Sequence, residues 1–332
     1  MKKLLAIAVA AALTAPAAMA ETTLYGKLHA TAGQVKTNGV KENVVESHNS
    51  RIGVKGSTEL DNGLSATYGV EYGLSLDGDA GNSNNLVGTA ANANSTDRTL
   101  TARNTFVGVK GGFGEVRVGR HDTPAKLATA GLDAFADGYA DMGNIIVSDN
   151  QRVDNAVAYI GKFGPVGVAA AHSTQTNLSG LGETDDGDVN GGTDANSLLV
   201  NYSNGPIYAG LGHTAVAKTV KTTNLGVGYK AEAGHFANVV LEQAKSSAGE
   251  KLDNAYVAAG FKTGAATLKA AYGESKYKPT GSKEKQTTLG VDYSLGKKTS
   301  TYLLLNEDKN IDHDSTTNDK TTQAVVGVVT EF

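Results

Sequence analysis

The feature that most constrains the fold of this chain is an alternation of apolar and polar side chains. It recurs in about sixteen stretches of roughly ten residues between Glu21 and Phe332. A period of two places each kind of side chain on its own face of a β-strand, and the 3.6-residue period of helices is almost absent. The pattern therefore predicts an all-β chain. The stretches are 22–33, 50–60, 64–76, 99–111, 114–120, 152–162, 165–173, 197–203, 206–216, 221–230, 235–245, 252–262, 265–275, 285–295, 300–308 and 321–332.

The connections between these stretches alternate in length. Tight turns lie at 61–63, 111–113, 163–165, 204–206, 232–234, 263–264 and 296–298, and longer polar loops at 77–97, 121–150, 174–196 and 309–320. Short turns on one rim, long loops on the other and an even number of strands are typical of a transmembrane antiparallel β-barrel. A tilted strand also crosses a bilayer with about ten residues.

Residues 1–20 have the pattern of a secretory signal peptide. Two lysines precede a short apolar run, and the segment ends in Ala-Met-Ala at 18–20. We therefore expect cleavage after Ala20 and a mature barrel of residues 21–332. A transmembrane anchor is less favoured, because the run is too short to span a bilayer and Pro16 interrupts its end.

Composition narrows the function classes. Cleavage takes away two of the 30 basic residues and none of the 34 acidic ones, a balance that excludes a strongly basic nucleic-acid binder. Cysteine is absent, so the chain has no disulfide framework and no thiol nucleophile. The mean hydropathy of −0.24 fits a barrel as well as a soluble protein, because a barrel strand presents only one face to lipid.

The last stretch runs to Phe332, the C-terminal residue, with Ala324, Val326, Val328 and Thr330 on one face. This ending resembles the assembly signature of outer-membrane barrels. Aromatic residues gather beside the tight turns, where an interfacial girdle is expected. They are Phe113, Phe163, Tyr202, Tyr208, Tyr229, Phe236, Phe261 and Tyr293.

Several motifs make the chain from Glu21 to Phe332 resemble the trimeric general porins of Gram-negative outer membranes. They are LYGK (24–27), SRIGVKG (50–56), ELDNGLSA (59–66), RNTFVGVKGGFGEVRVGR (103–120) and RVDNAVAY (152–159). The resemblance implies a homotrimer of sixteen-stranded barrels in the outer membrane, in contact with lipid and lipopolysaccharide, whose third external loop folds inward. It also implies recognition of Phe332 by the barrel-assembly machinery, and passive diffusion of small hydrophilic solutes and ions.

The resemblance further implies that Lys27, Arg51, Arg103 and Arg152 form a basic wall at the channel narrowing. Alternation agrees for three of them, since Arg51, for example, is opposite in phase to Ile52. Arg103 is less regular, because Asn104 takes a position expected to face lipid and Phe106 restores the pattern. Secondary lumen positions are expected for Lys55, Glu71 and Arg117.

The inward loop is expected at 121–150, and its acids should face the wall arginines across the channel. The loop lacks the PEFGG-like stretch common in the family, so the aspartate that meets the arginines stays open. We favour Asp133 and Asp137, then Asp141, with Asp122 also on the acidic side; Asp149 and a single base, Lys126, complete the charges of the loop.

Three further residues are expected to have structural roles. Arg120 is out of phase with Arg117 and immediately precedes the loop, so anchoring the loop base or a subunit contact is favoured over a pore role. Glu21 and the Phe332 carboxylate are expected close together where the first and last strands close the barrel.

Other motifs carry little chemistry. Seven histidines are scattered without a nucleophile and base in evident reach, so no catalysis is expected. Acidic tips at 77–82 and 183–194 do not complete an EF-hand and fit weak divalent-cation binding at most. GLGHTA (210–215) approximates a dinucleotide fingerprint but lies inside a strand with no helix after it. No cofactor and no defined metal site are expected.

Two alternatives to a diffusion channel stay open: a channel specific for a sugar or an organic anion, and a non-conducting adhesin or structural barrel. Ion selectivity depends on opposing charges. The net negative charge and the acidic loops favour cations at the mouth, whereas the wall bases favour anions at the narrowing. The wall bases should dominate, because salt screens the remote loops.

Overall fold

The computed structural model describes residues 20–76, 100–176, 193–217, 219–311 and 319–332. The expected signal peptide lies outside the described residues except for Ala20. Most of the two acidic tips expected to bind divalent cations, 77–82 and 183–194, also lies outside them. Those expectations therefore stay predictions.

Seventeen strand segments of the described chain form one sheet with antiparallel pairing throughout. They are β1 Ala20–Thr37, β2 Val40–Ser47, β3 Arg51–Glu59, β4 Ser65–Leu74, β5 Leu100–Gly111, β6 Gly114–Asp122, β7 Arg152–Phe163, β8 Val166–Thr176, β9 Thr193–Asn204, β10 Ile207–Val216, β11 Val220–Lys230, β12 Phe236–Ser246, β13 Lys251–Thr263, β14 Ala266–Tyr277, β15 Lys283–Ser294, β16 Thr299–Ile311 and β17 Asp319–Glu331.

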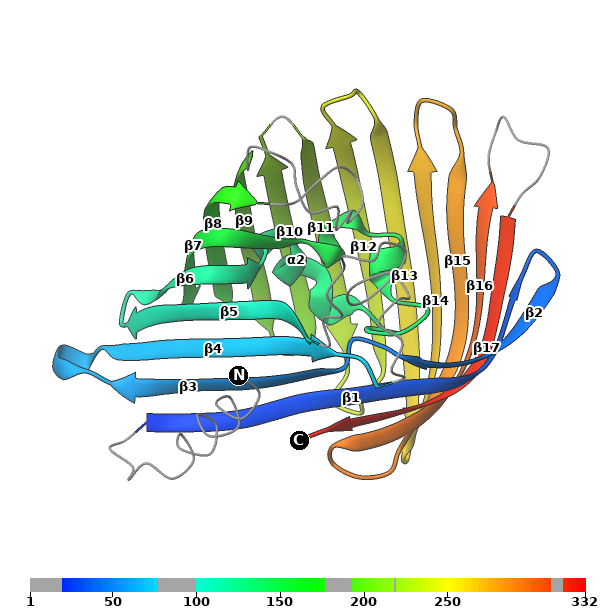
Figure 1. The fold of residues 1–332 in the computed structure, drawn as a ribbon, viewed down its shortest axis with the longest axis horizontal. Helices are drawn as coiled ribbons and strands as arrows, with labels where there is room; N and C mark the ends of the chain where they lie inside the picture. Colours follow the sequence, from blue (N-terminus) through cyan, green and yellow to red (C-terminus); the bar gives the residue numbers. More distant parts are fainter. Residues whose placement is uncertain (1–19, 77–99, 177–192, 218, 312–318) are drawn as a thin grey trace, which may run out of the picture.

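The sheet closes on itself through β1 (Figure 1). One edge of β1 pairs with β17, and the other edge pairs first with β3, over residues 20–27, and then with β2, over residues 30–37. β2 and β3 are therefore two parts of one strand. Counted this way, the described segments make sixteen strands around a closed barrel, which confirms the predicted fold class.

The register of closure differs from one expectation. Phe332 lies opposite Gly26, and the two residues exchange backbone hydrogen bonds of 3.3 and 3.1 Å. Glu21 pairs with Ser57 instead. At 3.3 Å per residue, Glu21 lies roughly 16 Å further along β1 than Gly26. Glu21 is therefore not close to the Phe332 carboxylate, because β1 extends past the end of the last strand.

The alternation pattern missed β2, whose sequence VKENVVES is mostly polar. A local signal was present, however. Asn38 and Gly39 connect β1 to β2 with φ angles of 49° and 93°. Asn-Gly is the dipeptide that a two-residue hairpin turn favours, because both of its central residues need positive φ. This turn could have located the hairpin from the sequence.

The outward face of the wall is apolar, as the alternation predicts. Val107, Val157, Leu198, Leu289 and Val326 each leave more than half of their surface exposed. Of the expected aromatic girdle, six residues are exposed: Phe113, Phe163, Tyr202, Tyr229, Phe261 and Tyr293.

The other two aromatic residues of the expected girdle face inward. The Tyr208 hydroxyl donates a hydrogen bond of 2.8 Å to the Ala128 carbonyl, and Phe236 packs against the buried cluster inside the barrel. Both sit on the lumen side of strand ends, where the inward loop needs contacts. Proximity to a tight turn therefore does not by itself place an aromatic residue on the lipid face.

The segment between β6 and β7 folds into the barrel, which confirms the predicted inward third loop (Figure 1). It begins with α2 Pro124–Thr129, which the Thr123 hydroxyl caps by accepting a hydrogen bond of 3.1 Å from the Lys126 amide. Three short 3-10 helices follow: η2 Ala130–Leu132, η3 Met142–Asn144 and η4 Val147–Asn150. A further one, η1 Asp61–Gly63, forms the turn between β3 and β4.

The largest buried cluster lies between this loop and the barrel wall. Loop residues Leu132, Phe135, Met142, Ile145 and Ile146 pack there against wall residues that include Val240, Tyr256 and Leu304. The loop is thus held by apolar burial on one side of the lumen. Within the described ranges, no helix is long and apolar enough to cross a membrane.

Candidate functional site

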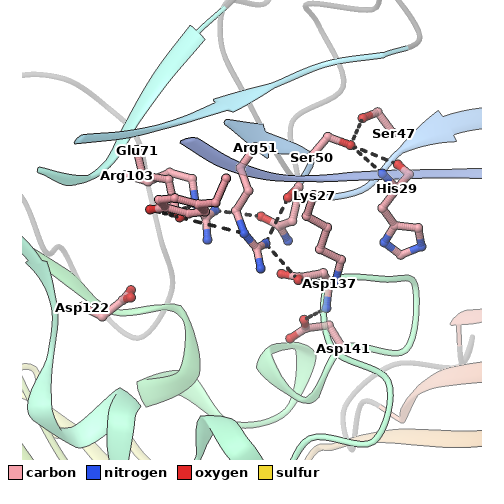
Figure 2. A network of polar contacts seen from close by, with 12 residues as sticks. Lys27, His29, Ser47, Ser50, Arg51, Glu71, Arg103, Asp122, Asp137 and Asp141 are labelled. Carbon is pink, nitrogen blue, oxygen red and sulfur yellow. Dashed lines mark hydrogen bonds and ion pairs between the residues drawn. The ribbon is translucent and has the colours of Figure 1, made fainter. Parts of the chain in front are cut away.

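Asp137 is the loop residue that meets the basic wall (Figure 2). Its Oδ2 atom accepts hydrogen bonds from Lys27 Nζ at 2.7 Å and from Arg51 Nη1 at 2.9 Å. Lys27 and Arg51 are direct partners across the β1–β3 ladder, so one carboxylate serves two bases. Burial alone would raise the pKa of Asp137, but Arg51 and Lys27 outweigh it and hold this pKa well below its usual range.

Asp137 reaches the wall because of its backbone conformation. Its φ angle is 63°, in the left-handed region that aspartate tolerates better than most residues. Its amide donates a hydrogen bond of 2.6 Å to Asp141 Oδ2. The turn is therefore fixed from within the loop, and its tip presents a carboxylate to the bases.

Glu71 of β4 connects Arg51 to Arg103. Arg103 Nε lies 2.6 Å from Glu71 Oε1, and Arg51 Nε lies 4.0 Å from Glu71 Oε2. The Tyr25 hydroxyl donates to the same Oε2 atom at 3.0 Å, and Arg103 Nη1 donates to Asn49 Oδ1 at 3.2 Å. Charge-assisted bonds of this kind hold the arginines in fixed positions along the wall.

A β-bulge in β5 explains the irregular phase of Arg103. The pairing register shifts between Val70 and Tyr72, so that Glu71 lies opposite two residues, Arg103 and Asn104. A bulge adds one residue to a strand and turns the side chains that follow it. Both Arg103 and Asn104 consequently bond partners on the lumen side.

The expectation that Phe106 faces lipid is not met. Its ring lies 4.0 Å from the Arg117 guanidinium carbon and packs beside His121. Its neighbour Val107 is the exposed residue, with 61% of its surface accessible. Without the bulge, Arg103 would share the outward phase of Val107.

Asp122 and Arg152 form a second charged group at the base of the loop. They are cross-strand partners at the ends of β6 and β7, with Arg152 Nε 2.8 Å from Asp122 Oδ1. Lys126 Nζ lies 3.7 Å from the same oxygen, and Asn104 Nδ2 donates to Asp122 Oδ2 at 2.6 Å. Asp122 therefore neutralises bases beside it instead of facing the wall from the loop.

Asp133 and Asp141 lie elsewhere than expected, because in the described structure they bond to loop amides and to Tyr256 and not to the wall arginines. Asp133 accepts hydrogen bonds from two loop amides and from the Tyr256 hydroxyl, and Asp141 accepts them from two loop amides. Burial, with neighbouring carboxylates, raises the pKa of both groups. Burial and Asp141 raise the pKa of Asp149 to about 7.

Arg117 and Lys55 lie apart from this network. Arg117 bonds Glu115 twice, with Nε to Oε1 at 2.7 Å and Nη2 to Oε2 at 2.9 Å. Lys55 lies on the same face of β3 as Arg51, with its Nζ 4.8 Å from the centre of the Tyr25 ring. Arg117 is thus balanced by a local acid.

Arg120 follows the phase of the exposed residues Val116 and Val118 and so lies on the outward side of β6. Its Nη1 is 2.5 Å from Asp154 Oδ1, and its Nε donates to the Ala102 carbonyl at 3.1 Å. These contacts link β6 to both neighbouring strands at the point where the inward loop begins.

The wall residues that hold the loop were not predicted from the sequence. Glu242 accepts hydrogen bonds from the Val147 and Ser148 amides at 2.7 and 2.9 Å, and Lys269 Nζ donates to the Ala134 carbonyl at 2.6 Å. A polar residue at a lumen-facing position can contact either water or the inward loop, and the sequence pattern does not distinguish the two. Further contacts of this kind come from Ser197, Tyr208, Asn224, Asn238 and Tyr256.

Lumen-facing glycines make room for the loop. A Cβ atom at Gly210 would lie 2.4 Å from the Ala128 carbonyl oxygen, and one at Gly212 would lie 2.7 Å from Ala125 Cα. The backbone of α2 thus packs directly against the GLGHTA stretch, since only glycine lets the two backbones approach this closely.

The assembled site carries more positive than negative charge. Hydrogen bonds and ion pairs join residues of the wall strands to residues of the inward loop. Five bases, Lys27, Arg51, Arg103, Lys126 and Arg152, surround three acids, Glu71, Asp122 and Asp137. Such an arrangement can sort passing ions by sign.

Comparison with protein families agrees with this geometry. The family model described as Gram-negative porin matches residues 6–313. The chain belongs to this family of Gram-negative porins. It is accordingly an outer-membrane channel protein, as predicted from the sequence.

The porin is also similar to curated outer-membrane proteins. It is 27% identical to the major outer membrane protein P.IB of Neisseria sicca over 345 aligned residues, which cover 90% of the chain and 92% of the relative. Its identity to P.IB of Neisseria meningitidis serogroup B is 38%, over 38% of the chain and 35% of that protein.

Solved structures support the fold of the porin. An anion-selective porin from Comamonas acidovorans superposes with a TM-score of 0.75 at 22% identity, over 94% of this chain and 100% of that one. OmpF of Salmonella typhi in complex with daunomycin gives a TM-score of 0.68 at 16% identity, over 94% and 97%. At these identities the similarity establishes the barrel architecture.

Proposed function

We propose that Lys27, Arg51, Arg103 and Arg152, with Asp137 opposite and Glu71 and Asp122 between them, form the charged narrowing of the channel. We further propose that this narrowing favours small anions. The observation that carries the proposal is the contact of Asp137, at the tip of the inward loop, with Lys27 and Arg51 on the wall.

The preference for anions follows from the excess of bases over acids at the narrowing. Two unit charges 4 Å apart interact by about 1 kcal/mol in water and more strongly next to a low-dielectric wall. The Debye length is about 8 Å at physiological salt, so salt largely screens the effect of any acid that lies farther than this from the narrowing. The Comamonas acidovorans porin of similar fold is described as anion-selective, which supports the same sign here.

The porin is proposed to work as a homotrimer without catalysis or a cofactor. A trimer form of OmpT from Vibrio cholerae, solved after folding in vitro, shares the fold with a TM-score of 0.64. Lipid and lipopolysaccharide are the proposed neighbours of the apolar outer face, and the barrel-assembly machinery is the proposed reader of Phe332. A cleaved signal peptide at 1–20 is the proposed export signal.

Recording ion conductance of the purified porin in planar bilayers tests the channel. We expect stable open channels. Small hydrophilic solutes should lower their current only when the solute concentration is high. Absence of any open channel would contradict the proposal and favour an adhesin or structural barrel. Block by a sugar or an organic anion at low concentration would instead favour a substrate-specific channel.

A further inference from the structure

Three aspartates of the inward loop, Asp133, Asp141 and Asp149, come together within the loop. Asp133 follows η2, Asp141 precedes η3 and Asp149 lies in η4. One carboxylate oxygen from each lies within 4.8 Å of the other two. Three separate turns of the loop thus converge on one point through carboxyl groups.

The hydrogen bonds of the cluster leave acceptor positions open. A carboxylate offers about four lone-pair positions. Asp133 uses three of them, for the amides of Phe135 and Met142 and for the Tyr256 hydroxyl. Asp141 uses two, both for loop amides. Two of the three carboxylates are therefore oriented by the backbone and still have positions for a further ligand.

Asp149 provides a second and independent indication of a ligand. Only 7% of its surface is exposed, and its Oδ1 atom has no hydrogen-bond partner in the described structure. A buried polar oxygen without a partner is costly and calls for an explanation. Its carboxylate is directed at those of Asp133 and Asp141.

The positive charge near the cluster does not balance it. Lys126 lowers the pKa of Asp141 and Asp149 but is also 3.7 Å from Asp122. Three carboxylates at this spacing repel one another unless they are protonated or share a cation. A cation would satisfy all three at once.

We propose that Asp133, Asp141 and Asp149 bind one calcium ion, which ties three turns of the inward loop together. Calcium takes carboxylate oxygens at about 2.3–2.6 Å in flexible geometry, so three oxygens within 4.8 Å of one another are near the spacing that it needs. Magnesium, which needs contacts of about 2.0–2.1 Å, would require the carboxylates to close in.

This site goes beyond the proposed sorting of ions at the wall and does not depend on it. The ion would stiffen the loop behind Asp137, whose amide is held by Asp141. Calcium binding and ion selectivity are measured separately, so either proposal can fail alone.

The test is a calcium titration of the purified porin by calorimetry, after removal of metal with a chelator. We expect one calcium ion per chain in the wild type. In Asp149→Asn the affinity of that ion should fall about tenfold or more, because a charged ligand is lost. The matched control is Asp253→Asn, which alters an exposed carboxylate of β13 that pairs with Lys278. This control should bind calcium as the wild type does.

Equal calcium binding by the wild type and Asp149→Asn would overturn the proposal, and so would an equal loss in the Asp253→Asn control. If the Asp149→Asn variant fails to fold, a second measurement on the wild type alone still tests the site. Crystals soaked in terbium should give an anomalous peak within about 2.6 Å of one oxygen of each aspartate. No peak at that position would also overturn the site.

Discussion

Arg51 places a positive charge on the lumen wall, where it bonds Asp137 and lies beside Glu71. In Arg51→Ala we expect the anion preference to fall roughly fivefold, because a charge worth about 1 kcal/mol at 4 Å in water is removed. The measurement is the reversal potential in a salt gradient. Arg120→Ala is the matched control, since Arg120 pairs with Asp154 on the outward side of β6 and should leave selectivity unchanged.

Asp137→Asn should shift selectivity in the opposite direction. The substitution removes the acid shared by Lys27 and Arg51 but keeps the side-chain volume, so the site becomes more positive and the anion preference rises. Reversal potentials of the two variants measured in one salt gradient check this. A shift of the same sign in both variants would show that Asp137 and Arg51 do not act at one point.

At the residue scale the sequence reasoning placed some side chains and not others. Strand phase placed Arg51 on the lumen face, because the ladder around it is regular. Phase failed for Arg103, since the bulge opposite Glu71 reverses the side on which the side chain lies. No pattern distinguished Asp137 from Asp133, because that difference arises from the turn of one backbone and its hydrogen bonds.

At the element scale, α2 packs so closely against β10 that one added methyl group should lower stability and alter conductance. Gly210→Ala would place Cβ 2.4 Å from the Ala128 carbonyl oxygen, and a backbone atom cannot yield as a flexible side chain does. We expect a loss of stability of about 1–3 kcal/mol and an altered single-channel conductance, as the loop moves. Thermal unfolding and conductance measure the two effects.

The matched control for this substitution is Gly112→Ala, because a Cβ atom at Gly112 meets nothing within 4 Å. It should change neither conductance nor stability appreciably. If Gly210→Ala behaved like this control, the loop would not rest on β10 as described.

The positions of strands were predictable from the sequence where one face of the strand meets lipid. The alternation is then strict, and strand ends fall within a few residues of those expected, as for β13 and β14. It fails in β2, whose polar sequence carries no apolar face. The path of the inward loop was not predictable, since it depends on contacts with distant strands, such as Glu242 with Ser148.

At the scale of the whole molecule, the number of strands and the closure of the barrel followed from counting alternating stretches and turns. Closure joins the first strand of the sheet to the last, because β1 pairs with β17 in a register that bonds Phe332 to Gly26. The exact register was not predictable from the sequence. β1 is longer than its partner, and a shift of the pairing by two residues leaves each side chain on the same face of the sheet.

The central claim is that the local bases at the narrowing decide selectivity over the net negative charge of the chain. The most direct measurement is the reversal potential of the wild-type porin in a potassium chloride gradient across a planar bilayer. If the bases dominate, the potential has the sign set by chloride permeation and grows as the salt concentration is lowered and screening weakens. A potential of the sign set by potassium at all salt concentrations would contradict the claim.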